Sequence, residues 1–261
     1  MNWWQGLVLG IVQGLTEFLP VSSSGHLVVA QALIGFDSPG IAVEVLLHVA
    51  TLLAVVIVYR KRLITLLVGL AKAERPAVQY TALIVIATIP AGIVGITLES
   101  TVETAFGSLR LVGVSFLLTG FILWSTRFLR TKSADQSVGW MAAIVVGFAQ
   151  AVAVFPGISR SGATIVSAMW FRVSGVQAAE FSFLMAIPAI GGAALLQVAD
   201  ARSLTSMGGI LPLGVSFLAA LVSGVFAIKL LVYLLRKQEF HQFAGYCWLL
   251  GLVVISWSLF A

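Results

Sequence analysis

Apolar segments long enough to cross a lipid bilayer fill most of this chain and constrain its fold more than any other feature. A transmembrane helix needs about 20 mainly apolar residues to cross a hydrocarbon layer of about 30 Å. Six segments are close to that length, and they cover residues 41–59, 77–98, 109–128, 177–199, 210–235 and 243–260. The sequence therefore predicts an all-α, polytopic helical membrane protein with six transmembrane helices.

The scarcity of charge excludes the main soluble classes. Of the 261 residues, 60% are hydrophobic and 10% are charged, whereas soluble domains average about 25% charged residues. One soluble core of this length could not bury so much apolar surface, and the apolar content also excludes a disordered chain. Cys247 is the only cysteine, so no intrachain disulfide can form.

The basic residues predict how the chain is oriented in the membrane. They cluster in three loops, at 60–75, 127–132 and 236–237, and the positive-inside rule places such loops in the cytoplasm. The loops around 99–103 and 200–202 then lie outside, as do both termini. The net charge of +5 therefore concerns orientation, and no nucleic-acid partner is expected. The first five residues carry no basic residue, so no cleaved signal peptide is predicted.

An internal repeat organises the chain. At an offset of 137 residues, six identities recur: Gly10, Gln13, Phe18, Ser22, Ser24 and Gly25 match Gly147, Gln150, Phe155, Ser159, Ser161 and Gly162. Each half, 1–135 and 136–261, then contains one interrupted apolar stretch followed by three spans. Because three is odd, the second half enters the membrane with the opposite orientation, which predicts an inverted-topology repeat within one membrane domain.

The two interrupted stretches, 3–35 and 138–172, are predicted to be re-entrant helix hairpins. Each has Pro, Gly and Ser near its middle, and two full spans would return to the same side equally well. The arm at 22–35 would extend only about 21 Å as a helix, which favours the re-entrant form. Re-entrant hairpins would bring both Ser-rich turns together near the bilayer centre, in protein or beside a wet cavity.

The two turns carry residues suited to binding an anion. In each turn a Pro ends one helix, and a Ser stands where it can cap the next one. The amino-terminal ends of helices present free N–H groups and a partial positive charge. Arg160 adds a guanidinium whose geometry suits phosphate oxygens.

Helical spacing predicts that further groups converge on the same place. Gln13 and Glu17 share a face before the first turn, and Ser23 and His26 share a face after it. A carboxylate beside a phosphate is repulsive unless a cation lies between them. Glu17 therefore implies a divalent cation such as Mg²⁺ or Ca²⁺.

Each of these residues also has a structural interpretation. The serines could only cap helices, Gln13 could hold helices together, and Arg160 could pair with Glu17. For three residues near span ends we favour a structural role: Glu44, His48 and Glu180. Glu180, for example, could pair with Arg172.

At these motifs the sequence resembles the bacterial undecaprenyl-pyrophosphate phosphatase family of the bacitracin-resistance type. The similar segments are 13–26, 156–164 and 180–184, and the resemblance extends over the whole chain. It implies an inverted repeat with two re-entrant hairpins in the bacterial inner membrane. It also implies hydrolysis of undecaprenyl pyrophosphate for peptidoglycan synthesis, at a site that opens toward the periplasm and uses a divalent cation.

The resemblance also implies roles for individual residues. Glu17 would be the metal-linked carboxylate, Ser23 and His26 the nucleophile and its base, and Arg160 the pyrophosphate clamp. Substrate-binding side chains would be Gln13, Ser22, Ser24, Ser159, Ser161 and Thr164. Attack by His26 itself or by metal-activated water fits the same residues. Gln13 stands where the family permits Glu or Gln, so this chain has one carboxylate fewer for a metal.

The main alternative function is a transporter or flippase for an anionic or lipid-phosphate substrate. Inverted repeats and broken helices facing an anion are typical of transporters too. The combination of Glu17, Ser23 and His26 favours hydrolysis, because binding and release need no nucleophile. The expected partners are a polyprenyl pyrophosphate and membrane lipids, and the sequence leaves a homodimer open.

Overall fold

The computed structural model of the chain describes residues 1–36, 42–129, 137–197 and 209–260. Within these ranges the chain forms α-helices joined by short turns and contains no β-sheet. The helices are α1 (Trp3–Phe18), α2 (Ser23–Leu33), α3 (Ala42–Val58), α4 (Arg60–Ala71), α5 (Arg75–Thr97), α6 (Glu99–Phe106), α7 (Leu109–Trp124), α8 (Trp140–Val152), α9 (Arg160–Trp170), α10 (Gly175–Gln197), α11 (Ile210–Arg236) and α12 (Phe243–Trp257). The predicted all-α fold class is confirmed.

The long helices make this a multi-pass membrane protein. Five described spans are long and apolar enough to cross a bilayer, and they contain α5, α7, α10, α11 and α12. A sixth is formed by α3 if it is counted together with α4, which continues it after a bend of 77°. Leu218, Val222 and Phe226 on α11 are 58–68% exposed, as apolar side chains that face lipid would be.

Two helices lie in segments that the sequence predicts to be loops. The short α4 carries its basic residues in its first turn, and its Leu66 and Gly69 are buried. Such a helix is suited to lie along a membrane surface. The other is α6, beside the predicted outer loop around Glu99. Four residues of the predicted loops lie outside the described part of the chain: Arg130, Lys132, Asp200 and Arg202.

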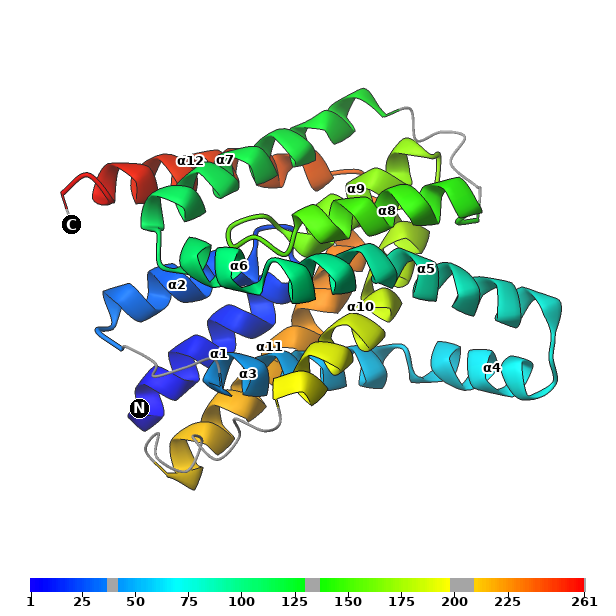
Figure 1. Cartoon of the computed structure of the whole chain (residues 1–261), viewed down its shortest axis with the longest axis horizontal. Coiled ribbons are helices and arrows are strands. Elements are labelled where there is room, and N and C mark those ends of the chain that lie inside the picture. Colours follow the sequence, from blue (N-terminus) through cyan, green and yellow to red (C-terminus); the bar gives the residue numbers. More distant parts are fainter. Residues whose placement is uncertain (37–41, 130–136, 198–208, 261) are drawn as a thin grey trace.

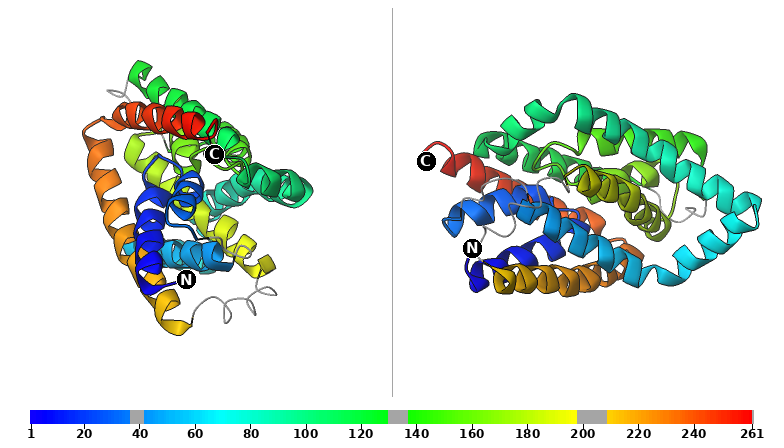
Figure 2. Two further views of the ribbon diagram at one scale, coloured as in Figure 1. Left: turned by 90° about the vertical axis from the view of Figure 1, so that its left-hand side faces the viewer. Right: turned by 60° about the horizontal axis from the view of Figure 1, so that its bottom comes forward.

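Two pairs of helices are interrupted where the sequence predicts hairpins. The chain breaks between α1 and α2 at residues 19–22, and between α8 and α9 at residues 153–159. Both termini lie at one end of the molecule, and the connection from α4 to α5 lies at the other end (Figures 1 and 2). Each hairpin begins with a helix that packs along a long helix of the bundle.

Helices of the first half pack against helices of the second. The helix α1 runs along α11, α8 runs along α5, and α7 runs along α12. Glycines allow the backbones to approach closely, as small residues do in membrane helix interfaces. A Cβ atom added at Gly10 would overlap the Ser216 carbonyl oxygen, and one at Gly147 would lie 3.0 Å from that of Ala87.

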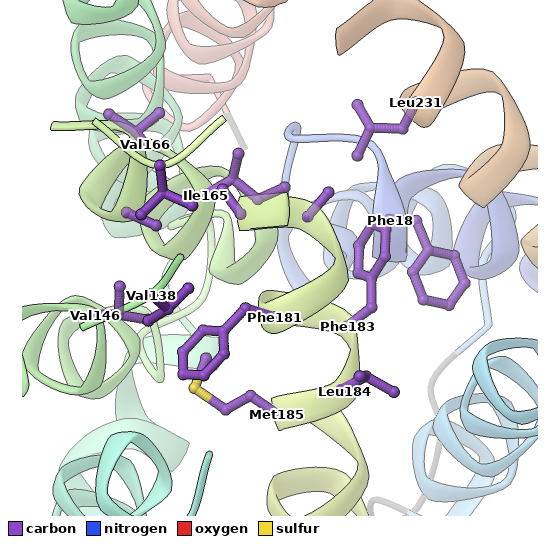
Figure 3. Close-up of a cluster of buried hydrophobic side chains, with 14 of the residues drawn as sticks. Phe18, Val138, Val146, Ile165, Val166, Phe181, Phe183, Leu184, Met185 and Leu231 are labelled. Carbon is purple, nitrogen blue, oxygen red and sulfur yellow. The ribbon is translucent and has the colours of Figure 1, made fainter. Parts of the chain in front are cut away.

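A cluster of buried aromatic and aliphatic side chains surrounds α10 and fixes the first hairpin against it. Figure 3 shows Phe181 on the side of α10 that faces Val146, and Phe183 on the side that faces Phe18. The rings of Phe18 and Phe183 meet edge to face, with their centroids 5.2 Å apart. Because Phe18 is the last residue of α1, this contact holds the end of that helix in place.

The close contact at Gly10 generates a test of the packing. We expect Gly10→Ala to lower the free energy of unfolding by about 1–3 kcal/mol, because the new methyl group overpacks the interface between α1 and α11. Thermal unfolding of the purified protein in detergent measures this change. The matched control is Gly95→Ala in α5, where an added Cβ has no neighbour within 4 Å. Equal melting temperatures for the two variants would contradict the close approach.

Candidate active site

The two helix breaks are built in the same way. At the first, the Ser22 hydroxyl accepts a hydrogen bond from the Gly25 amide at 3.4 Å. At the second, the Ser159 hydroxyl accepts one from the Gly162 amide at 3.0 Å. These residues correspond at the offset of 137, so each predicted cap position is occupied by a capping serine. Ser22 has a φ of 70°, which a residue with a side chain seldom adopts.

A second pair of contacts repeats at the same offset. The hydroxyls of Ser22 and Ser24 lie 3.2 Å apart, and so do those of Ser159 and Ser161. Ser161 also donates across to the Leu19 carbonyl oxygen at 3.2 Å. The two breaks therefore touch each other, and the amino-terminal ends of α2 and α9 meet in one place.

Glycines and a threonine shape the junction between the breaks. A Cβ at Gly25 would lie 3.0 Å from the Gly157 Cα, and Gly157 itself has a φ of +89° that favours glycine. The buried Thr119 hydroxyl on α7 donates to the Gly157 carbonyl oxygen at 2.9 Å and accepts from the Ser159 amide at 3.1 Å. Thr119 had no signal in the sequence, since it lies inside an apolar span.

Glu17 stands at the centre of the site and is 5% exposed. Its Oε1 atom pairs with the Arg160 Nη2 atom at 2.6 Å. Its Oε2 atom accepts a hydrogen bond from the Ser23 hydroxyl at 2.5 Å and another from the Gln13 amide nitrogen at 3.1 Å. The structure thus brings together four of the predicted residues, and the ion pair that we considered as a structural alternative is present.

Arg160 is also held by contacts with α10. Its Nη1 atom donates to the Ser182 carbonyl oxygen at 3.4 Å. The Thr164 hydroxyl lies 2.6 Å from the Ser182 hydroxyl and donates to the Arg160 carbonyl oxygen. Thr164 and Ser159 are each 1% exposed, so their hydroxyls serve protein contacts in this state. The guanidinium is only partly buried and remains accessible.

His26 is turned away from Ser23. Its Nδ1 atom lies 2.7 Å from the Ser22 carbonyl oxygen, so this nitrogen must carry a proton. Its Nε2 atom lies 2.7 Å from the hydroxyl of Tyr246 on α12, which also stacks on the imidazole with the rings 9° from parallel. The spacing predicts a shared face for Ser23 and His26, but these two bonds orient the ring toward α12. The acceptor in contact with Ser23 is Glu17.

His48, for which we favoured a structural role near a span end, reaches the site from α3. Its Nε2 atom lies 3.6 Å from the Glu17 Oε2 atom, and its Nδ1 atom bonds the Glu44 carbonyl oxygen at 2.7 Å. The sequence could have suggested it only as a histidine within an apolar span. Its contact with Glu17 depends on how two helices pack, which no local pattern encodes.

The possible pairing of Glu180 with Arg172 is not formed. Glu180 instead forms an ion pair with Arg62, whose Nε atom lies 2.9 Å from the Glu180 Oε1 atom. The bend between α3 and α4 brings Arg62 to α10. The sequence does not indicate this bend.

The donor set suits a hard cation only in part. The Gln13 Oε1 atom is buried and has no hydrogen-bond partner within the described structure, so one amide oxygen is free to accept a ligand. Among the described residues no group of three or more His, Cys, Asp or Glu side chains could enclose a metal ion. Mg²⁺ is commonly held by one or two carboxylates together with phosphate oxygens of a substrate. Glu17 and Gln13 fit that mode of binding.

Comparison with known proteins identifies similar chains. The family model described as "Bacitracin resistance protein BacA" matches residues 6–253. A protein of Desulfatibacillum aliphaticivorans named undecaprenyl-diphosphatase is 40% identical, with 98% of each chain covered. Proteins of the same name from Parabacteroides distasonis and Desulfosudis oleivorans are 41% and 42% identical, over 99% and 96% of this chain and 99% and 97% of theirs.

The pairing of Glu17 with Arg160 can be tested by a double-mutant cycle. We expect Glu17→Gln and Arg160→Gln each to lower the free energy of unfolding by about 3 kcal/mol, because each leaves a charge unpaired inside the protein. The double variant removes both charges and should cost clearly less than the sum of the two.

Denaturation of the four proteins in the same detergent measures the coupling. Additive losses would show that the two side chains do not depend on each other.

Proposed function

Because the chain belongs to the family described as bacitracin resistance protein BacA, we propose that it is an undecaprenyl-diphosphatase. It removes the terminal phosphate of a polyprenyl diphosphate in the membrane and regenerates the monophosphate carrier lipid for peptidoglycan synthesis. Bacitracin resistance is the associated property. The observation that carries this proposal is the contact of Ser23 with Glu17, beside Arg160, where two helix amino-terminal ends meet.

Arg160 is the group that binds the diphosphate. In the free site its charge is balanced by Glu17, and the planar guanidinium can hold two phosphate oxygens at once. The amino-terminal ends of α2 and α9 add partial positive charge from two directions. Binding of the diphosphate would therefore replace part of the pairing with Glu17 and leave that carboxylate available to Ser23.

Ser23 is the proposed nucleophile. Its partly exposed hydroxyl already points its proton at the Glu17 Oε2 atom, so Glu17 can accept the proton as Ser23 attacks the terminal phosphorus. The bond from that phosphorus to the bridging oxygen then breaks, and the polyprenyl monophosphate leaves with the electron pair. Water then attacks the phosphoserine, and its proton leaves with the inorganic phosphate. The proton held by Glu17 returns to the Ser23 oxygen and restores the serine.

A divalent cation is part of the proposal, with Glu17 and the free Gln13 Oε1 atom as its protein ligands. When bound, it would offset the negative charge of the diphosphate next to Glu17. Because this chain offers a single carboxylate there, most of the other ligands would be oxygens of the substrate and water.

The position of the site suits a lipid substrate. Beside the site, a cavity of about 540 Å³ lies between α6, α7 and the second break, and its walls combine apolar side chains with serines and threonines. Its lining residues include Thr101, Leu111 and Phe155. Since α6 lies at the predicted outer side, this cavity supports an opening toward the periplasm in a protein of the inner membrane. The prenyl chain can then remain in the bilayer while phosphate leaves into water.

The transporter interpretation is not favoured. The relatives are named for hydrolysis, and a carrier would gain nothing from the hydrogen bond between a serine hydroxyl and a buried carboxylate.

The proposed activity predicts release of inorganic phosphate from a prenyl diphosphate by the purified protein. EDTA should abolish this release, and added Mg²⁺ or Ca²⁺ should restore it. Arg160→Lys is the informative variant, because it keeps the charge that Glu17 needs but loses the two-pronged geometry. We expect its kcat/KM to fall about 100-fold, comparable to the loss of one preorganised donor. Full activity in EDTA would contradict the metal, and no phosphate release by the wild type would contradict the function.

The nucleophile can be identified from a trapped intermediate. We expect Ser23→Ala to lower kcat by about 10³-fold or more with a smaller change in KM, since Ser23 acts on the transition state. Quenching the wild-type reaction should trap a phosphoenzyme that survives acid, as phosphoserine does. A control is Ser167→Ala, since that hydroxyl bonds the Ala163 carbonyl within α9. An acid-labile phosphoenzyme that disappears in His26→Ala would transfer the nucleophilic role to His26.

A further inference from the structure

A second cleft lies away from the candidate active site, where α3, α10 and α11 come together. It has a volume of about 390 Å³, and its lining residues are Val58, Tyr59, Val176, Glu180, Ile228, Lys229, Val232, Tyr233 and Arg236. None of these residues takes part in the active site. Along α3, Tyr59 lies 11 residues beyond His48, which corresponds to about 16 Å.

One face of α11 supplies the cations of this cleft. Lys229, Val232, Tyr233 and Arg236 are spaced i, i+3, i+4 and i+7, so they lie along one stripe of the helix. Lys229 and Arg236 are therefore two turns apart, or about 10 Å. A third cation stands at the rim, where the Lys237 ammonium lies 4.6 Å from the centre of the Tyr233 ring.

The charges of the cleft do not balance. Glu180 is the one carboxylate in the lining, and Arg62 neutralises it at 2.9 Å. Arg62 is held in turn over the Tyr80 ring at 4.8 Å. Lys229 and Arg236 form no ion pair and no hydrogen bond within the described part of the chain. Two positive charges thus face a cleft between membrane helices without an anion.

The position of Lys229 makes this imbalance significant. It lies seven residues before the end of α11, inside an apolar helix, where an unpaired charge is costly and commonly marks a binding site. A lysine that only reaches the membrane surface needs neither a cleft nor a second cation beside it. Tyr59 and Tyr233 add hydroxyl groups, and Val58, Val176 and Ile228 add apolar walls.

We propose that this cleft binds the phosphate headgroup of an anionic membrane lipid. Lys229 and Arg236 pair with the phosphate, and the valine and isoleucine side chains contact the start of the lipid chain. Basic pockets between membrane helices are suited to such headgroups. The cleft lies at the end of the molecule that carries Arg62 and Lys237, so it would serve the leaflet opposite to the proposed opening of the active site. The inference does not depend on the proposed hydrolysis.

Native mass spectrometry in a neutral detergent tests the proposal by titrating the protein with a short-chain phosphatidylglycerol. The double variant Lys229→Gln with Arg236→Gln should bind at least tenfold more weakly than the wild type. The matched control is Lys61→Gln with Arg75→Gln, which removes the same charge from exposed positions at the same end but outside the cleft. The control should bind as the wild type does. Equal weakening in both double variants, or none in the cleft variant, would overturn the proposal.

Two further probes distinguish the sources of phosphate. A prenyl monophosphate is titrated in the same way, and loss of its binding in the cleft variant would also support a lipid site. Inorganic phosphate at the same concentrations should not displace the lipid; complete displacement would overturn the lipid assignment in favour of a soluble anion.

Release of phosphate from prenyl diphosphate by the cleft variant should stay within twofold of the wild type. This result shows that the variant is folded, and it keeps the test of the lipid site separate from the test of the function.

Discussion

The ion pair between Glu17 and Arg160 is the interaction on which the rest of the site depends. A carboxylate and a guanidinium among membrane helices are tolerated only when each compensates the other, and these two are supplied by different halves of the chain. Their pairing requires both helices to break at matching depths. It also requires the two breaks to touch. They touch where Ser161 bonds the Leu19 carbonyl oxygen and where Gly25 approaches Gly157 closely.

Helix packing explains why the breaks can be held so firmly. Each interrupted hairpin begins with a helix that lies along a long span of the other half, α1 on α11 and α8 on α5, and in each case a glycine permits near contact of the backbones. Phe18 fixes the end of α1 against α10, directly beside Glu17. The polar groups are thus positioned by apolar contacts on both sides, so Ser23 and Arg160 remain partly accessible in a rigid setting.

The parts of the fold that could be predicted from sequence are those encoded locally. Apolar length indicates the spans, and Pro followed by Ser indicates the breaks and the caps at Ser22 and Ser159. The contacts of His48, Thr119 and Tyr246 could not be predicted, because each depends on which helices pack together. The pairing of Glu180 with Arg172 did not form for the same reason, since Glu180 pairs instead with Arg62, which the bend after α3 brings to α10. His26 shows that helical spacing predicts a shared face but not the rotamer of a side chain with better partners elsewhere.

The contact between Tyr246 and His26 has a consequence for the order in which the protein matures. The two residues are 220 positions apart, and Tyr246 lies on α12, the last helix in the described part of the chain. Until α12 inserts beside α7, the His26 imidazole lacks the hydrogen bond and the stacking contact of Tyr246. It keeps only the bond to the Ser22 carbonyl oxygen and the edge contact with Phe116. A nascent chain that already contains Glu17, Ser23 and Arg160 would therefore lack the Tyr246 contacts of His26 until α12 has been made.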